Sequence, residues 1–337
     1  MNIQTGVYAA IAAAGVLLAA GLFLSAVRRD GLPAGRAAAG YLLGLLCAFL
    51  LAKAVYAALF SSSLGGDGPL KWLRLKPGEF SFVAGALGFC LGNAWLFRGE
   101  RLPVLLDDLA VPGCLLAAFL RFGENFLGQH ALADPATLGL PAIGEGSLAA
   151  VFPLSVPDAW GYRYLSAATV SAVLCLAAAG LGLAAGRKNR GCAFRLPRGM
   201  VFTSCAFLLC ASRFFLELTR MESLLFYFVH VDQVLCAVFM ALLLLHACFA
   251  LRKRTGRFPA VYPAVFFLCL AVNGLTQYLM DKPWQFESLL PEGVFLWICD
   301  SLPGFGFLLL LATSALPVLL YGLLCRRLRN AAPGVPS

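Results

Sequence analysis

Residues 6–27 read GVYAAIAAAGVLLAAGLFLSAV, an apolar run without a charged side chain that ends at Arg28-Arg29. A helix needs about 20 residues to cross about 30 Å of hydrocarbon, so this run is long enough for one membrane span. Irregular backbone cannot face lipid, and the run is therefore predicted to be a helix. The charges of a cleaved signal peptide precede its apolar core, whereas here they follow it, so we expect a retained span.

The same pattern recurs along the chain. Eight further apolar runs of similar length lie near residues 37–60, 80–97, 103–120, 161–186, 199–219, 227–251, 258–280 and 298–325. Of the 337 residues, 61% are hydrophobic and only 13% are charged, whereas a soluble surface needs about a quarter of its residues charged. Disorder requires low hydrophobicity. These observations exclude soluble, disordered and fibrous classes, and they predict an all-α, polytopic membrane protein with about nine transmembrane helices.

The basic residues indicate how the chain is oriented. If the N-terminus is placed outside, 17 of the 26 Lys and Arg residues fall in inner loops or the C-terminal tail, eight fall in outer loops or helix ends, and Lys53 lies within a span. Cytoplasmic loops carry an excess of Lys and Arg, so the N-terminus is predicted outside and the C-terminus inside. The net charge of +9 thus reflects topology, and no nucleic-acid partner is expected.

Motifs for nucleotide, hydrolase or metal chemistry are absent from the sequence. There is no P-loop, no G-x-G-x-x-G, no H-E-x-x-H and no G-x-S-x-G. The 12 cysteines contain no C-x-x-C pair, and all but Cys192 lie in apolar runs, which indicates packing. The three histidines are too scattered to predict a metal site. No metal or cofactor is expected.

The first candidate site lies at the outer end of the fourth run. Arg121, Glu124, Asn125 and Gly128 have the spacing i, i+3, i+4 and i+7, which places them on one face of a helix. Gly123 and Gly128 would let another backbone or a lipid head group come close. Ionisable groups at this depth are costly and are functional candidates by default.

The second candidate site lies at the outer end of the sixth run, where Arg213, Glu217 and Arg220 share a helical face. A guanidinium can donate two parallel hydrogen bonds to a phosphodiester. Arginines at helix ends also extend to the interface without further function, and exposed Arg–Glu pairs contribute little. Two such groups at the same predicted depth favour a phospholipid head-group site.

At these residues the chain resembles the prolipoprotein diacylglyceryl transferase family, over roughly its first 250 residues. Residues 120–129 resemble the family signature G-R-x-G-N-F-x-N-G-E, and residues 213–220 resemble R-F-x-x-E-F-x-R. Residues 232–235 resemble G-Q-x-L, and residues 78–85 resemble G-G-x-S-x-H-G-G. Three further positions in the first two spans fit the family: Tyr8, Tyr56 and Lys53, the last where the family has an arginine.

The resemblance implies a seven-span membrane enzyme of the bacterial plasma membrane. Such an enzyme moves the diacylglyceryl group of phosphatidylglycerol onto the lipobox cysteine of a prolipoprotein signal peptide at the outer leaflet. Arg121, Arg213 and Glu124 are then the expected catalytic residues. The expected substrate-binding residues are Arg121, Arg213, Glu217, Arg220, Tyr8, Gly123 and Gly128.

The resemblance also implies a division of the chain. Residues 1–251 are expected to form the family-like core with an outer-face segment at 121–160. Residues 258–337 are expected to add two transmembrane helices and a basic cytoplasmic tail.

The chain departs from the family pattern at several positions. Val83 stands where the family has its catalytic histidine, Glu124 where it has asparagine, and Gln129 where it has glutamate. The family's R-x-P-S-Q-L-Y-E element has no convincing counterpart, and residues 160–164 are the stretch of this sequence that resembles it most.

Two functions therefore remain open. The chain is either an active transferase, with Glu124, His130 or His230 as general base, or a phospholipid-binding or assembly protein without catalysis. A transporter has less support, because no span carries a midplane charge pair.

Overall fold

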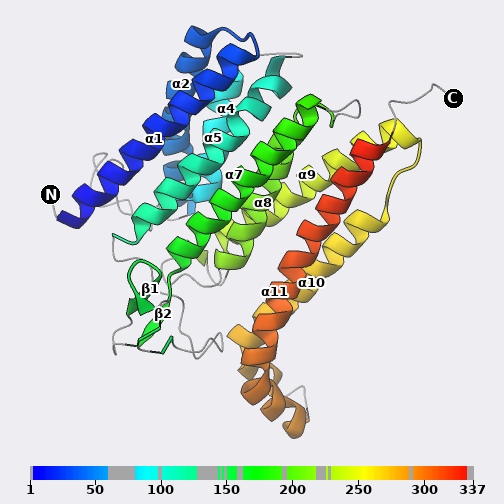
Figure 1. The fold of residues 1–337 in the computed structure, drawn as a ribbon. Helices are drawn as coiled ribbons and strands as arrows, with labels where there is room; N and C mark the ends of the chain where they lie inside the picture. Colours follow the sequence, from blue (N-terminus) through cyan, green and yellow to red (C-terminus); the bar gives the residue numbers. More distant parts are fainter. Residues whose placement is uncertain are drawn as a thin grey trace.

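The computed structural model describes residues 3–59, 80–97, 101–126, 143–144, 146–147, 150–157, 162–191, 196–217, 225–226, 229–287 and 291–331. Within these residues, each of the nine predicted apolar runs contains a helix (Figure 1). The helices are α1 (Ile3–Arg29), α2 (Ala34–Leu59), α4 (Phe82–Trp95), α5 (Arg101–Glu124), α7 (Ala167–Gly191), α8 (Met200–Leu216), α9 (Val231–Thr255), α10 (Val261–Asp281) and α11 (Glu292–Asn330), with the short 3-10 helix η5 (Pro283–Phe286).

Seven of the helices in the described part of the chain are long and apolar enough to cross a membrane: α1, α2, α5, α7, α9, α10 and α11. The other two, α4 and α8, are apolar but have only 14 and 17 residues. At about 1.5 Å per residue, they are shorter than the hydrocarbon thickness. A multi-pass helical membrane protein is thus confirmed, while nine crossings and the orientation remain predictions.

Two short antiparallel hairpins interrupt the helical pattern. Strand β1 (Ser155–Pro157) pairs with β2 (Arg163–Leu165), and β3 (Leu225–Phe226) pairs with β4 (Val229–His230). The expectation that the run at 161–186 is helical from its start was therefore wrong. Residues 163–165 instead form backbone hydrogen bonds with β1, and α7 begins only at Ala167.

Glycines allow α2 and α4 to pack closely. A Cβ added at Gly92 would lie 2.6 Å from the Gly44 Cα, and one added at Gly88 would lie 2.4 Å from the Cys47 carbonyl oxygen. Small residues of this kind let membrane helices approach backbone to backbone. The sequence therefore fixes α4 against the middle of α2.

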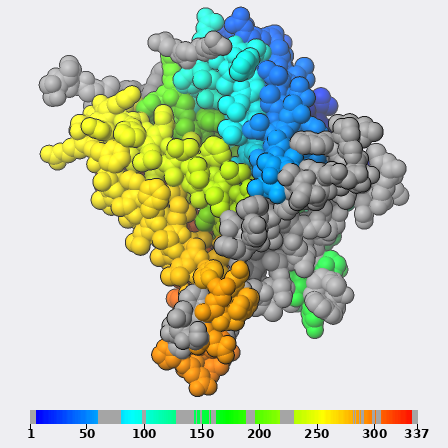
Figure 2. Space-filling view, turned by 180° about the vertical axis from the view of Figure 1, so that it is seen from behind, coloured from blue at the N-terminus to red at the C-terminus, as the bar shows by residue number. Residues whose placement is uncertain are grey.

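The C-terminal hairpin α10–α11 packs beside α8 and α9. The ring of Tyr321 on α11 stacks on Phe207 of α8 with 4.2 Å between centroids, and its hydroxyl donates to Thr203 Oγ1 at 3.1 Å. Asn273 of α10 donates to Thr313 Oγ1 of α11 at 3.0 Å. Figure 2 shows α10 beside α9 on one side of the molecule, with α2 and α4 on the other.

The two ends of the helical bundle differ in character. The last turns of α1, α9 and α11 carry basic residues and lie at one end. At the other end, where β1–β2 lies in Figure 1, α5 and α8 finish and α4 and α9 begin. The second end is the one that the charge pattern places outside, and the candidate site residues that the structure describes lie there.

Candidate functional site

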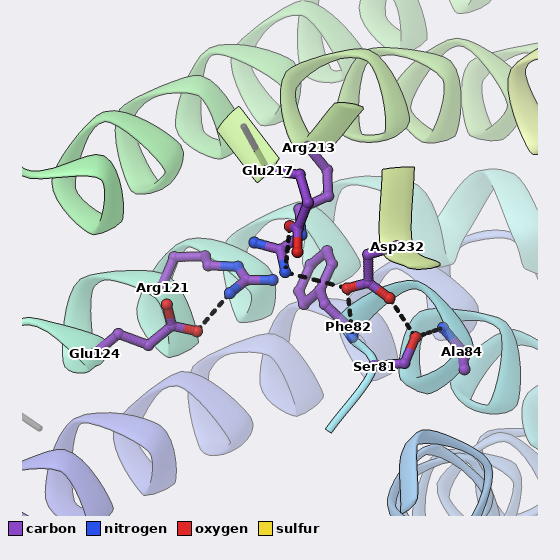
Figure 3. Close-up of polar contacts among 8 residues, drawn as sticks. All are labelled: Ser81, Phe82, Ala84, Arg121, Glu124, Arg213, Glu217 and Asp232. Carbon is purple, nitrogen blue, oxygen red and sulfur yellow. Dashed lines mark hydrogen bonds and ion pairs between the residues drawn. The ribbon is translucent and has the colours of Figure 1, made fainter. Parts of the chain in front are cut away.

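Four helix ends bring charged side chains together at one point of the bundle (Figure 3). The contributions come from the last turns of α5 and α8, the start of α4 and the first turn of α9. The side chains that meet are Ser81, Phe82, Arg121, Glu124, Arg213, Glu217 and Asp232.

Arg213 is the most heavily paired of these residues. Its Nη2 atom lies 2.8 Å from Glu217 Oε2, one turn further along the chain, and 3.1 Å from Asp232 Oδ2 at the start of α9. All three residues are buried, and Glu217 has no exposed surface. Among the described residues, Arg213 Nε and both carboxylate oxygens of Glu217 have no hydrogen-bond partner, although Glu217 Oε2 makes the ion pair with Arg213 Nη2. This part of the site therefore retains an unused donor on Arg213 and unused acceptor capacity on Glu217.

Asp232 also holds the start of α4. Its Oδ2 atom accepts a hydrogen bond from the Phe82 backbone N–H at 3.0 Å, and its Oδ1 atom accepts one from Ser81 Oγ. Ser81 is the N-cap residue of α4, and its Oγ atom accepts from the Ala84 N–H at 3.1 Å. A carboxylate at a helix N-terminus satisfies free N–H groups and interacts favourably with the helix dipole. Asp232 thus links Arg213 to α4.

Arg121 comes from the last turn of α5 and pairs with Glu124 at 2.5 Å. The Arg121 side chain is 3% exposed, whereas that of Glu124 is 17% exposed. The Cζ atom of Arg121 lies 3.9 Å from the centre of the Phe82 ring, and that of Arg213 lies 5.7 Å from the same centre. Two guanidinium groups thus share one aromatic ring, which attracts both electrostatically.

Tyr8 reaches the site from α1. A Cβ added at Gly123 would lie 2.9 Å from Tyr8 Cδ2, so the tyrosine ring packs directly on α5 beside Arg121. Gly123 was expected to admit a backbone or a lipid head group, and in the structure the space above it is filled by this ring.

Asn125 lies just beyond the end of α5 and binds the start of α7. Its Nδ2 atom donates to Thr169 Oγ1 at 2.9 Å, and its Oδ1 atom accepts from Ser166 Oγ at 2.6 Å. Thr169 in turn donates to the Pro153 carbonyl at 2.6 Å, next to strand β1. The network fixes the end of α5 to α7 and the first hairpin, and so helps to position Arg121.

Val83 lies in an apolar environment. It is 6% exposed and belongs to a core cluster with Phe207, Ala211 and Phe214 of α8. Lys53 is also buried at this end, with its Nζ atom 4.8 Å from the ring centre of Phe80.

Several predicted positions lie outside the described residues: Gly78, Glu79, Gly128, Gln129, His130 and Arg220. In the part of the chain that the structure does describe, no group of three or more His, Cys, Asp or Glu side chains could hold a metal ion.

The sequence pattern brought out Arg121, Glu124, Arg213 and Glu217, but it missed the carboxylate of Asp232 and the roles of Ser81 and Phe82. One feature of the sequence could have indicated Asp232: this position holds an aspartate, whereas the family pattern G-Q-x-L that residues 232–235 resemble begins with glycine. The contact between Ser81 and Asp232 spans 151 positions, so local spacing could not have predicted it.

Together these groups suit an anionic oxygen. Two guanidinium groups at one ring provide several fixed N–H donors, and such donors stabilise phosphate or a developing oxyanion most strongly where water is excluded.

The comparison with protein families gives one match. The family model for prolipoprotein diacylglyceryl transferase matches residues 1–249, which include every residue of the site described above. Helices α10 and α11 lie beyond the match. No curated protein and no solved structure matched the chain. The match covers most of the sequence, and the chain belongs to the prolipoprotein diacylglyceryl transferase family.

Proposed function

We propose that this protein transfers a diacylglyceryl group from phosphatidylglycerol to the lipobox cysteine thiol of prolipoproteins. Family membership indicates diacylglyceryl transfer to prolipoproteins in general. The observation that supports a phospholipid donor is the placement of Arg121 and Arg213 at 3.9 and 5.7 Å from one ring centre. That arrangement offers two adjacent donors to a phosphodiester.

In the proposed reaction the thiolate sulfur bonds to the terminal glyceryl carbon of the lipid. The bond between this carbon and its phosphate oxygen breaks, and glycerol phosphate leaves with the bonding electrons. Negative charge grows on that oxygen, where Arg121 and Arg213 stabilise it. Loss of one such donor typically costs about 10²–10³-fold in rate.

A base must take the thiol proton, and Val83 cannot. Without assistance, deprotonation of an ordinary cysteine near pH 7 costs about 2 kcal/mol, or roughly thirtyfold. A positioned base contributes about 10²–10⁴-fold. Glu124 suits the role best because its side chain is 17% exposed, while Glu217 and Asp232 are 0% and 1% exposed. His230, two residues before Asp232, is the second candidate.

The proposal includes nine crossings, with the N-terminus outside, the C-terminus inside and the site at the outer leaflet of the bacterial plasma membrane. Residues 1–251 would form the catalytic core, and residues 258–337 would add two helices and a basic tail. Tyr8, Gly123, Gly128, Glu217 and Arg220 would complete substrate binding.

A second function is favoured by one observation, the valine at position 83. On this alternative the protein binds phospholipid at the same arginines and transfers nothing, as a lipid-binding or assembly protein would.

Transfer of labelled diacylglyceryl from phosphatidylglycerol to a lipobox peptide tests the two functions. We expect transfer by the wild-type protein in proteoliposomes and its loss in Arg121→Ala and Arg213→Ala. The control is Arg29→Ala, whose side chain is 52% exposed at the opposite end of the bundle. Full activity in both site variants would refute the proposal. Bound anionic lipid that Arg213→Ala removes, without any transfer, would support the second function.

A further inference from the structure

A cavity lies at the basic end of the bundle, opposite the end that holds the candidate site. It has a volume of about 360 Å³ and is lined by Arg36, Trp95, Leu96, Phe97 and Arg101. These residues come from the start of α2, the end of α4 with the two residues after it, and the start of α5. Small-molecule sites usually enclose about 300–1,000 Å³. We call this site the arginine cavity.

Phe97 joins the wall of the arginine cavity to the packed core. Its side chain is 3% exposed, and it belongs to one core cluster with Val27 of α1, Ala37 of α2 and Leu105 of α5. Its backbone N–H donates to the Ala94 carbonyl at 3.0 Å. The ends of four helices thus contribute to one core at this point, and the two arginines of the cavity extend from a fixed frame.

The described carboxylates at this end of the bundle serve other partners. Asp30 and Asp108 pair with Arg29 at 3.3 and 3.8 Å. Asp107 accepts two backbone N–H groups at the start of α8, at 2.8 and 2.9 Å. Within the ranges that the structure describes, no ion pair joins a carboxylate to either arginine of the cavity. The arginine cavity therefore carries two positive charges that these residues do not neutralise.

This charge favours a ligand with net negative charge. Each guanidinium can donate two parallel hydrogen bonds to a phosphate group, and Arg36 and Arg101 are both exposed enough to be reached from outside. A zwitterionic head group would add an ammonium, and no carboxylate lines the cavity to receive it. The chemistry that fits is an anionic phosphate ester.

The apolar side of the cavity indicates that the phosphate belongs to a lipid. Trp95 is 71% exposed, and Leu91, one turn earlier on the same face of α4, is 53% exposed. An apolar strip therefore leads along α4 from the cavity toward the middle of the bundle. Tryptophan is enriched where lipid head groups meet acyl chains. A free phosphate would leave this strip without a partner.

We propose that the arginine cavity binds an anionic phospholipid of the leaflet at this end of the bundle. The phosphate lies on Arg36 and Arg101, and an acyl chain lies along Trp95 and Leu91. This lipid is a ligand separate from any lipid at the candidate site, so the proposal does not depend on transfer activity.

Arginine and tryptophan at helix ends can also act as general interfacial anchors. Anchors of that kind respond to the whole membrane surface, so every exposed arginine at this end should then matter equally. Arg187 near the end of α7 and Arg257 just after α9 are exposed and do not line the cavity. These two residues are the matched controls for Arg36 and Arg101.

The test follows the fluorescence of Trp95 in the full-length protein in lipid nanodiscs. The other tryptophans are changed to phenylalanine: Trp72, Trp160, Trp284 and Trp297. A brominated acyl chain quenches a tryptophan that it touches, so quenching reports a lipid chain at the arginine cavity. Trp95 lies at the opposite end from Arg121 and Arg213, so lipid at the candidate site does not contribute.

The probes are brominated phosphatidylglycerol and brominated phosphatidylcholine, each diluted in unbrominated phosphatidylcholine. An arginine near an anionic head group strengthens binding about fivefold. With two arginines, we expect half-maximal quenching by the anionic probe at a mole fraction about 25-fold lower than by the zwitterionic probe. Half-maximal quenching at the same mole fraction for both probes would overturn the proposal.

Two double variants assign the preference to the cavity. Arg36→Ala with Arg101→Ala should bring the two probes to the same mole fraction. Arg187→Ala with Arg257→Ala removes the same charge at the same end and should leave the preference unchanged. Thermal unfolding verifies that both double variants remain folded. An equal loss of preference in the two would show a general effect of surface charge and reject a specific site.

A competition experiment distinguishes a lipid from a free phosphate. Inorganic phosphate is added at constant ionic strength to the protein with bound brominated phosphatidylglycerol. Quenching that persists supports the lipid, because the acyl chain along α4 retains it in the cavity. Loss of quenching would show that the cavity takes a free phosphate and would overturn the lipid assignment.

Discussion

Phe82 determines how the two arginines of the site relate to each other. Two guanidinium groups would ordinarily repel, yet both lie within cation–π distance of this one ring, and each is paired with at least one carboxylate. The planar shape of each guanidinium matters for stacking and for forked hydrogen bonding, so lysine is not an equivalent replacement.

Arg213→Lys is therefore expected to lower the transfer rate by about 10²–10³-fold although it keeps the charge. Initial rates at fixed lipid content measure the effect, with Arg29→Lys at the opposite end as the control. A lysine variant with nearly wild-type activity would show that charge alone is sufficient.

Val83→His tests whether a histidine at this position could supply the base. Val83 is buried in the same core cluster as Ala211 and Phe214, so a larger polar ring there is expected to destabilise the protein by about 1–3 kcal/mol without raising the transfer rate. Thermal unfolding and initial rates are measured together, with Val83→Leu as a size control. A rate above the wild type would mean that the imidazole reaches the reacting thiol.

The sequence predicted those candidate site residues that pair with a residue one helical turn away. Arg213 and Glu217 are one helical turn apart, and so are Arg121 and Glu124, which makes their pairing readable from spacing. Asp232 could not be assigned in this way, because its partners on α4 depend on how α4 and α9 approach in space.

At the scale of elements, Asp232 fastens the start of α4 to α9. Asp232→Ala should destabilise the fold by about 3–5 kcal/mol, because it leaves buried Arg213 with one carboxylate fewer and removes an acceptor from the helix start. Ser81→Ala, which removes the cap and one hydrogen bond to Asp232, should cost less, about 1–2 kcal/mol. Thermal unfolding shows which of the two variants is the less stable. Hydrogen exchange at Ala84 shows whether the loss is local to α4, and the reverse order would argue against a role of Asp232 beyond capping.

The close packing of α2 on α4 gives a second prediction at this scale. Gly92→Ala places a Cβ 2.6 Å from the Gly44 Cα, and the overpacking should destabilise the fold by about 1–3 kcal/mol. Gly21→Ala on α1 is the matched control, since nothing lies within 4 Å of the added Cβ. Similar unfolding temperatures for the two variants would show that α2 and α4 can separate without loss.

Hydropathy located each α-helix in the described part of the chain because the bilayer demands long apolar runs, but it did not place the helix ends. Residues 163–165 were assigned to a span and instead form strand β2, since their partners at 155–157 supply the hydrogen bonds that a helix would otherwise supply. Helix α11 begins at Glu292, before the apolar run that predicted it.

At the scale of the whole molecule, the predicted topology depends on whether the short helix α4 crosses the membrane. A phosphatase reporter fused after residue 59 is expected to be active, and one fused after residue 97 inactive, because nine crossings place these points on opposite sides. A fluorescent protein at the C-terminus, expected inside, is the control for insertion. Equal activity at both points would show that α4 does not cross.

The contacts of Asp232 have one more consequence, which concerns how the site and the bundle influence each other. The same carboxylate oxygen holds Arg213 and the Phe82 N–H, so a ligand that attracts Arg213 also alters the docking of α4 on α9. Coupling of this kind is reciprocal. A bound head group should therefore change the opening equilibrium of α4, and any force that loosens α4 should change lipid affinity by the same factor.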